Sequence, residues 1–128
     1  MGDSITEITC WRPMVWSQLT SAGLTNNITL VGSMTDISCS GVPSTFDKHH
    51  EGHSGIQAYD VARQNIAGWV QNTKPDIVQF MLGTNDVNIG KRQPPAILDA
   101  YTSILNTIRS ANPNVKIIVS FEYLRLRG

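Results

Sequence analysis

The amino-acid sequence predicts an α/β fold built on a parallel sheet. Along the chain, three helix patterns with a period of about 3.6 residues alternate with three short apolar runs typical of buried strands. This alternation favours a parallel α/β sheet over a helix bundle or a β-sandwich. Since no internal repeat, low-complexity tract or linker interrupts the order, we expect residues 1–128 to form a single domain.

The first helix is predicted over residues 11–22. Proline is tolerated in the first turn, where Pro13 lies, and Gly23 is placed to stop the helix. A short apolar strand is then predicted over residues 28–32. The helical spacing is set by Trp11, Val15, Leu19 and Ala22.

The second helix is predicted to follow Gly55 and to end before Lys74, which precedes a proline. Residues 76–82 then form a nearly continuous apolar run, which predicts a strand buried on both faces. The helix face expected to pack is formed by Tyr59, Ala62, Ile66 and Trp69.

The third helix is predicted to begin at the proline pair 94–95 and to end at the Asn-Pro-Asn sequence of residues 112–114. Residues 115–120 form the last predicted strand. The clearest apolar stripe of the chain supports this helix and contains Ile97, Leu98, Tyr101, Ile104, Leu105 and Ile108.

The length and composition of the chain limit the kinds of function that it can have. A chain of 128 residues could bury a moderate core. With 41% hydrophobic residues and a formal net charge of +0, nothing suggests nucleic acid or an anionic membrane as a partner. No apolar run approaches the roughly 20 residues that a membrane helix needs.

Two polar motifs lie where strands are expected to end. Gly-Asp-Ser-Ile-Thr occupies residues 2–6, and Gly-Thr-Asn-Asp occupies residues 83–86. A serine on a tight turn presents its hydroxyl outward, and an asparagine amide at a nearby strand end can donate to a developing oxyanion. We therefore predict Ser4 as a nucleophile. The alternative is an ordinary turn or helix N-cap serine, which is the commoner fate of serines.

The flanks of these motifs extend the pattern. Residues 2–12, 31–33, 50–55 and 82–87 together resemble carbohydrate esterase family 3, the acetyl xylan esterase group of the SGNH hydrolases. The resemblance covers Gly2 to about Val119 and implies a flavodoxin-like three-layer sandwich with strand order 2-1-3-4-5. It also implies a serine esterase that deacetylates xylan or a related polysaccharide, without a cofactor.

Both ends of the chain depart from this family. Its catalytic base comes from an Asp-x-x-His motif after the last strand, but no Asp or His follows residue 114 here. Its first strand should precede Gly2, where only Met1 stands. We therefore expect an incomplete domain that lacks the first and last strands, has an empty central position in the sheet, and is inactive as written. No function is assigned to residues 121–128.

The predicted oxyanion donors are the backbone amides of Ser4 and Gly55 and the side-chain amide of Asn85, all at the carboxyl ends of strands. Gly55 is preferred because it is expected just before a helix, where amides lack partners. Gly32 is the second choice. An ordinary helix start at Gly55 and a turn residue at Asn85 are the alternatives.

The loop that carries His49, His50 and His53 also contains Glu51. Imidazoles and carboxylates suit zinc, but the glycines of this segment predict a loop instead of a shared helix face, so no metal site is predicted. Glu51 and His53 are instead assigned to the substrate-facing border. His53 comes from the wrong loop to serve as the missing base.

Two further carboxylates are assigned to that border. Asp3 is also expected to hold the serine turn through its side chain, and Glu7 follows in the same connection. Three tryptophans, Trp11, Trp16 and Trp69, could stack on sugar rings. Trp69 is expected in the core because of its helical spacing, and Trp11, near the serine turn, is ambiguous.

A disulfide between Cys10 and Cys39 is predicted, because both follow elements on the same side of the expected sheet; two unpaired cysteines are the alternative. In similar secreted fungal esterases such a bridge suits an oxidising compartment, so the protein is expected to be extracellular. The Asn27-Ile28-Thr29 glycosylation sequence receives little weight, because Thr29 is expected to enter a buried strand.

Three functions compete at this point. The first is a monomeric esterase whose partner is an acetylated polysaccharide substrate. The second is a non-catalytic carbohydrate-binding remnant that uses the same cleft. The third is a non-functional fragment.

Overall fold

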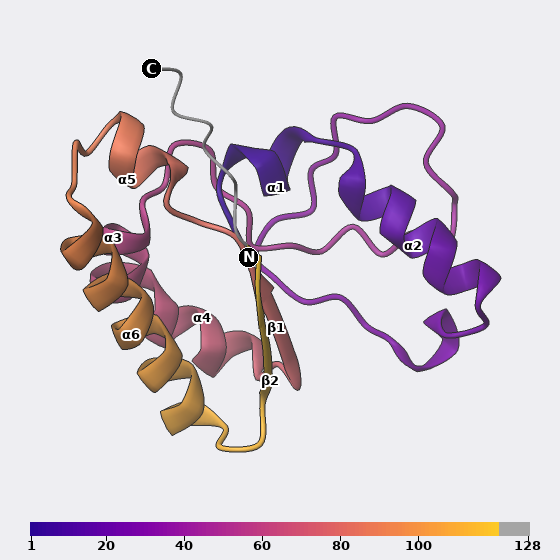
Figure 1. Cartoon of the computed structure of the whole chain (residues 1–128). Helices are drawn as coiled ribbons and strands as arrows, with labels where there is room; N and C mark the ends of the chain where they lie inside the picture. The colour runs from indigo at the N-terminus through magenta and orange to yellow at the C-terminus, as the bar shows by residue number, and fades with distance from the viewer. Residues whose placement is uncertain (121–128) are drawn as a thin grey trace. The chain divides into compact units, whose positions relative to one another are not determined.

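The computed structural model describes residues 1–120 (Figure 1). These residues divide into two compact units, here called the first unit (Met1–Ser54) and the second unit (from Gly55 onward). The prediction of one domain stays a prediction. The tail over residues 121–128, to which no function was assigned, lies outside the described residues. No helix in the described part is both long and apolar enough to cross a membrane.

The first unit contains the helices α1 (Ser4–Ile8) and α2 (Trp11–Ser21) and the short 3₁₀ turn η1 (Thr25–Asn27). The α2 prediction is confirmed, and Gly23 follows the helix with a positive φ of 71°. The predicted apolar face is wrong in detail, because α2 buries Arg12, Pro13 and Trp16 while Val15 is exposed.

The predicted strand over residues 28–32 does not form. The described part of the first unit has only two isolated bridges, between Gly2 and Gly52 and between Met34 and His50. A strand needs a neighbour for its backbone groups. Leu30 instead donates its N–H to the carboxylate of Asp47 at 2.9 Å, so a side chain replaces the missing ladder partner.

A small aromatic core and a disulfide hold the first unit. The rings of Trp16 and Phe46 are both buried and meet edge to face, with centroids 5.9 Å apart. Cys10 and Cys39 are bridged, with their Cα atoms 5.7 Å apart. The predicted disulfide is therefore confirmed, and it ties the start of α2 to the irregular segment that follows η1.

The second unit begins with one helical stretch made of α3 (Ala58–Asp60), the π-helical turn η2 (Val61–Asn65) and α4 (Ile66–Thr73). The predicted packing face is wrong, since only Ile66 of that set is buried. A π turn adds a residue to the helical repeat, and the buried face shifts at that point. The buried residues of this stretch are Ala58, Val61, Ile66 and Val70.

The sheet of the second unit is parallel and pairs β1 (Ile77–Phe80) with β2 (Lys116–Val119), with Ile77 opposite Lys116. Both strands lie inside predicted ranges. In Figure 1, α4 and the long helix α6 (Pro94–Ala111) lie on the same side of these strands. The prediction of burial on both faces is wrong, because β1 buries alternate residues and Ile77 is 59% exposed.

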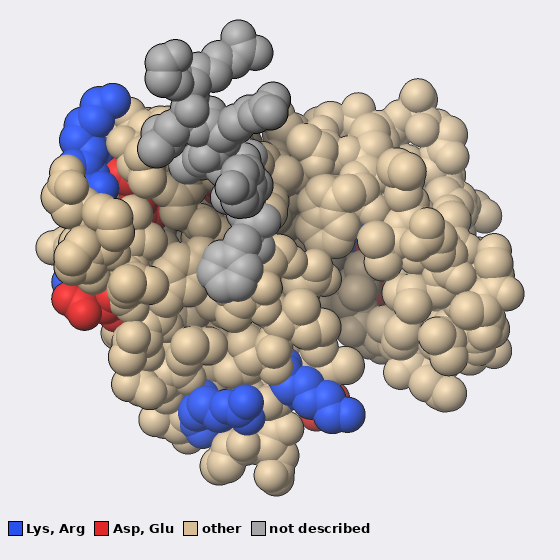
Figure 2. All heavy atoms as spheres, in the orientation of Figure 1, with Lys and Arg blue, Asp and Glu red and all other residues tan. Residues whose placement is uncertain are grey.

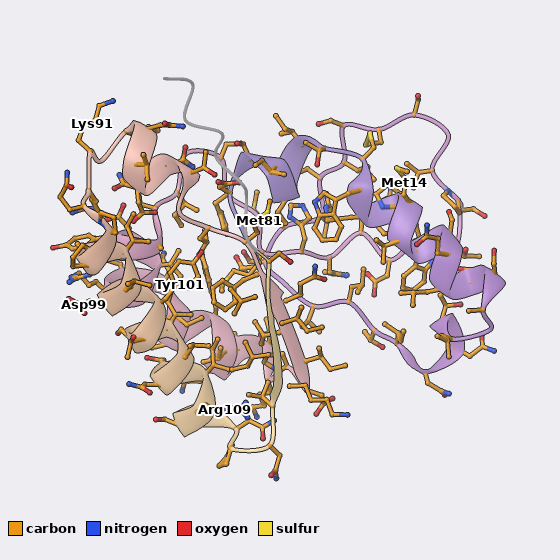
Figure 3. The ribbon with its side chains drawn as sticks, viewed as in Figure 1. Met14, Met81, Lys91, Asp99, Tyr101 and Arg109 are labelled. Atoms are coloured by element: carbon orange, nitrogen blue, oxygen red, sulfur yellow. A yellow bond between two sulfur atoms is a disulfide. The ribbon has the colours of Figure 1, made fainter. Side chains whose placement is uncertain are left out.

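Helix α6 holds the end of β1 in place. Its residues Ala100, Ile104 and Ile108 are buried, and of these Ile104 and Ile108 belong to the predicted apolar stripe. Tyr101 lies between α6 and the sheet (Figure 3), where its ring stacks on Phe80 with centroids 5.3 Å apart. Its hydroxyl donates to the carbonyl of Leu82 at 2.7 Å, just before the Gly-Thr-Asn-Asp motif. The packing of α6 therefore fixes the strand end from which that motif starts.

One member of the predicted stripe, Leu98, is 65% exposed and gives a matched control for the core of α6. We predict that Ile104→Ala lowers the free energy of unfolding by about 2–5 kcal/mol, because it opens a cavity at a fully buried site. Leu98→Ala on the same helix should change it by less than about 0.5 kcal/mol. Urea unfolding of both variants measures the difference, and equal effects would contradict this packing.

Candidate active site

Ser4 is the first residue of α1, and Asp3 caps the helix. The Asp3 carboxylate accepts the N–H of Ile5 at 3.0 Å, and its carbonyl accepts the N–H groups of Thr6 and Glu7. Asp3 is 2% exposed, so it holds the serine turn as predicted. The alternative that Ser4 itself is the N-cap is wrong. Among the described residues, none forms a hydrogen bond with the half-buried Ser4 hydroxyl.

Arg12 fixes the far end of α1. Its buried guanidinium donates to the carbonyls of Thr6 at 2.8 Å and Glu7 at 3.1 Å. It also donates to the carbonyls of Asp36 at 3.2 Å and Lys48 at 3.3 Å. A buried cation is tolerated only when its donors are satisfied, and here backbone oxygens satisfy them. Arg12 thereby joins α1 to two loop segments that are distant in sequence.

The segment around Gly52 lies against α1. Gly2 donates its N–H to the carbonyl of Glu51, and His53 donates to the carbonyl of Gly2, both at 3.0 Å. A Cβ on Gly52 would lie 2.8 Å from the backbone nitrogen of Glu7, closer than real Cβ contacts. Only a glycine at position 52 therefore allows this segment to lie so close to α1.

Glu51 organises the loop with two partners. Its carboxylate accepts the N–H and hydroxyl of Ser33 at 2.9 and 2.6 Å, and it lies 2.5 Å from Nε2 of His53. Burial would raise the pKa of Glu51, but the hydrogen bonds from Ser33 and His53 outweigh it and lower the pKa below its ordinary value. Glu51 is therefore an anion paired with His53. The neighbouring carboxylate, Glu7, accepts the N–H of Ser54.

The other two histidines are also engaged locally. His50 is buried; its Nδ1 accepts the N–H of Gly52 at 3.1 Å, and its Nε2 lies 3.1 Å from the Asp36 carboxylate. Burial and then the nearby Arg12 lower the pKa of His50, which keeps the ring neutral. His49 pairs with Asp47 at 2.7 Å. Within residues 1–120, no group of three or more histidines, cysteines or carboxylates is placed to hold a metal ion.

The two candidate oxyanion glycines differ in surroundings. Gly55 has a φ of +81°, is exposed, and has open space where a Cβ would lie. The helix expected directly after it begins later, at Ala58. Gly32 has a φ of +152°, and a Cβ there would lie 2.1 Å from the carbonyl oxygen of His50. Close packing therefore explains the glycine at position 32, whereas only backbone conformation requires the one at position 55.

Asn85 lies in α5 (Thr84–Asn88), one residue after its start. Its Nδ2 donates to the carbonyl of Ile56 at 3.0 Å, so the structure brings Asn85 to the residue that follows Gly55. The Gly83 that precedes α5 has a φ of +109°, which suits the sharp turn out of β1. The convergence of this pair with Ser4 stays a prediction, as do the catalytic roles of all three residues.

Asp86 is a positioning residue to which the sequence assigned no role beyond its place in the Gly-Thr-Asn-Asp motif. Its carboxylate is 0% exposed and accepts the N–H groups of Ala58 at 2.6 Å and Tyr59 at 3.0 Å. It therefore caps α3 from a distant part of the chain. Its neighbours in the sequence are mostly polar, so no local pattern marks this carboxylate as buried.

Two arginines, Arg63 and Arg92, contact the ring of Tyr59 at the start of α3. The guanidinium carbons of Arg63 and Arg92 lie 3.5 and 3.4 Å from the ring centroid of Tyr59. Arg92 also donates from Nε to Gln57 at 2.9 Å and lies 4.0 Å from Asp86. These contacts add to the Asp86 cap in fixing residues 57–59.

The sequence-family model of the GDSL-like lipase/acylhydrolase family matches residues 1–127. The chain belongs to this family. No curated protein matches the chain. The family assignment agrees with an SGNH-type fold in which helices cover a small parallel sheet.

Three solved structures are similar to this GDSL-like chain. One is a carbohydrate esterase family 3 protein from Talaromyces cellulolyticus, with 67% identity and a TM-score of 0.91. Another is a serine-to-alanine mutant of an acetyl esterase with acetate ion, with 66% identity and the same TM-score. A family 3 carbohydrate esterase from Clostridium thermocellum has 32% identity and a TM-score of 0.77.

In each comparison the similarity covers 93% of this chain. It covers 58% of the first two proteins and 57% of the third. The GDSL-like chain thus spans less than two thirds of the esterases it resembles.

We predict that Asp86→Asn lowers the free energy of unfolding by about 1–3 kcal/mol, since the amide presents a donor to buried N–H groups that need an acceptor. The control is Asp99→Asn, at an exposed position on α6 labelled in Figure 3, which should have little effect. Urea unfolding and hydrogen exchange at the amides of Ala58 and Tyr59 provide the measurements. Unchanged exchange at both amides in Asp86→Asn would contradict the capping role.

Proposed function

We propose that the chain supplies the nucleophile and the oxyanion donors of a serine esterase that removes acetyl groups from xylan or a related acetylated polysaccharide. The observation that carries this proposal is the capping of α1 by Asp3, which leaves the Ser4 hydroxyl without a hydrogen-bond partner among the described residues. Membership of an acylhydrolase family supports it. So does the similarity to an acetyl esterase whose serine-to-alanine mutant is described with acetate ion.

In the proposed reaction, the Ser4 hydroxyl attacks the acetyl carbonyl and loses its proton to a base. The oxyanion that develops accepts hydrogen bonds from the N–H groups of Ser4 and Gly55 and from the amide of Asn85. The N–H of Ser4 suits this role, because the first amides of a helix have no partner within the helix. The sugar oxygen then leaves with a proton, and water hydrolyses the acetyl-enzyme to release acetate.

The base is the part that this sequence does not supply in the family's position, since no Asp-x-x-His follows Val115. We therefore propose that the 128-residue chain alone has little activity. His53, already paired with the Glu51 carboxylate, is the histidine to test as a substitute. His50 suits the role less well, because both of its ring nitrogens are engaged and its pKa is lowered by burial and Arg12.

An uncharged polymer fits the surface and the border residues. On the face shown in Figure 2, charged side chains are sparse and most of the surface is uncharged. Of the four residues assigned to the substrate-facing border, Asp3 and Glu51 are buried, so Glu7 and His53 are the ones we propose to contact a sugar. The disulfide supports the proposed extracellular location. We propose a monomer.

The activity test uses p-nitrophenyl acetate and two chains. The 128-residue chain should hydrolyse it barely above background, because a serine without a base keeps only residual catalysis. A chain extended at both ends with the flanking segments of the Talaromyces cellulolyticus relative should be active. In that extended chain, Ser4→Ala should reduce kcat by about a thousandfold or more, whereas Ser17→Ala, at an exposed serine on α2, should not.

Two results would contradict this proposal in different ways. Equal activity of the extended chain with and without Ser4→Ala would exclude Ser4 as nucleophile. Ser4-dependent turnover by the 128-residue chain would exclude the proposed need for an added base, and loss of that turnover in His53→Ala would identify His53 as the base. Sugar binding without turnover in the extended chain would favour a carbohydrate-binding remnant.

A further inference from the structure

The structure reverses one expectation drawn from the sequence, the burial of the Asn27-Ile28-Thr29 glycosylation sequence. The sequence pattern predicts that Thr29 lies in a buried strand. No strand forms there, and both Asn27 and Thr29 are exposed. No other Asn-x-Ser/Thr sequence occurs in the chain. The structural objection to modification at Asn27 is therefore removed.

The local backbone presents Asn27 at the end of a turn. η1 ends at Asn27, and the N–H of Ile28 closes the turn by donating to the carbonyl of Thr25 at 3.2 Å. Ile28 then adopts an extended conformation and is half-buried between its two exposed neighbours. In the described part of the chain, neither the Asn27 amide nor the Thr29 hydroxyl forms a hydrogen bond that modification would break.

Two further features of the first unit fit a glycan at this position. The Cys10–Cys39 disulfide in the same unit suits an oxidising compartment, and sequons of secreted proteins are modified in surface loops. Leu24 and Val31, on either side of the sequence, are large apolar side chains that are exposed. A bulky hydrophilic glycan beside them would reduce the exposed apolar surface available for self-association.

We propose that Asn27 is a site of N-linked glycosylation. The proposal rests on the extracellular location proposed above, and not on esterase activity. The co-reactant is an oligosaccharide carried on a lipid pyrophosphate. The Asn27 amide nitrogen forms a bond to C1 of the first sugar, the bond from C1 to the pyrophosphate oxygen breaks, and the lipid pyrophosphate leaves with the electron pair. The amide gives up one proton to a base, and no oxidation or reduction occurs.

The test is secretion of the full chain from yeast behind a cleavable signal peptide, with peptide mass spectrometry at residue 27. The wild-type chain should carry a glycan that peptide N-glycosidase removes, converting the asparagine to aspartate. N27Q and T29A should lose it. Two matched controls keep the acceptor sequence and should retain the glycan: T29S, which preserves a hydroxyl, and N26Q, which changes the adjacent exposed asparagine.

A secreted, disulfide-bonded wild-type chain with unmodified Asn27 would overturn the proposal. If the chain is not secreted, translation in the presence of microsomes tests the same modification by electrophoretic mobility. An identical mobility of the wild-type and N27Q chains in that assay would also overturn the proposal. The glycan should also be removable without denaturation and without loss of the far-ultraviolet circular dichroism spectrum. Removal only after denaturation would contradict the exposed position of Asn27. None of these readouts depends on ester hydrolysis.

Discussion

The buried guanidinium of Arg12 is the group on which the arrangement around Ser4 depends. Its donors engage the carbonyls of four residues, so one side chain joins the end of α1 to two loop segments that are distant in sequence. Lysine could not do the same, since it lacks the planar fork that reaches several oxygens at once. The serine turn is thus held from both ends of α1, by the Asp3 cap at the start and by Arg12 at the end.

In the second unit a buried anion, the carboxylate of Asp86, holds backbone groups in place as the Arg12 cation does in the first unit. The carboxylate of Asp86 holds the amides at the start of α3, and its neighbour Asn85 holds the carbonyl of Ile56. Adjacent side chains of one short motif thereby fix both the donors and an acceptor of the segment that follows Gly55. Since oxyanion donors must be held in place before the reaction, this rigidity is what the proposed mechanism requires.

The sequence predicted the features that local pattern controls, including α6 and β2, and it also predicted the pairing of Cys10 with Cys39. It failed where tertiary context decides. The prediction of a strand over residues 28–32 was wrong, because the N–H of Leu30 binds the Asp47 carboxylate and not a neighbouring strand. The predicted packing face of residues 58–73 was wrong because a π turn shifts it. The family resemblance located the candidate catalytic residues. It did not indicate the roles of Arg12 and Asp86, whose partners are backbone atoms distant in sequence.

The central proposal is that Ser4, Gly55 and Asn85 supply the donors of one oxyanion site. A crystal structure of the extended chain with a phosphonate bound covalently to Ser4 tests it most directly. The account predicts one phosphonate oxygen within about 3 Å of the Ser4 and Gly55 backbone nitrogens and of the Asn85 side-chain nitrogen. An Asn85 side chain beyond hydrogen-bond reach of that oxygen, with Gly55 at the opposite end of the sheet, would contradict it.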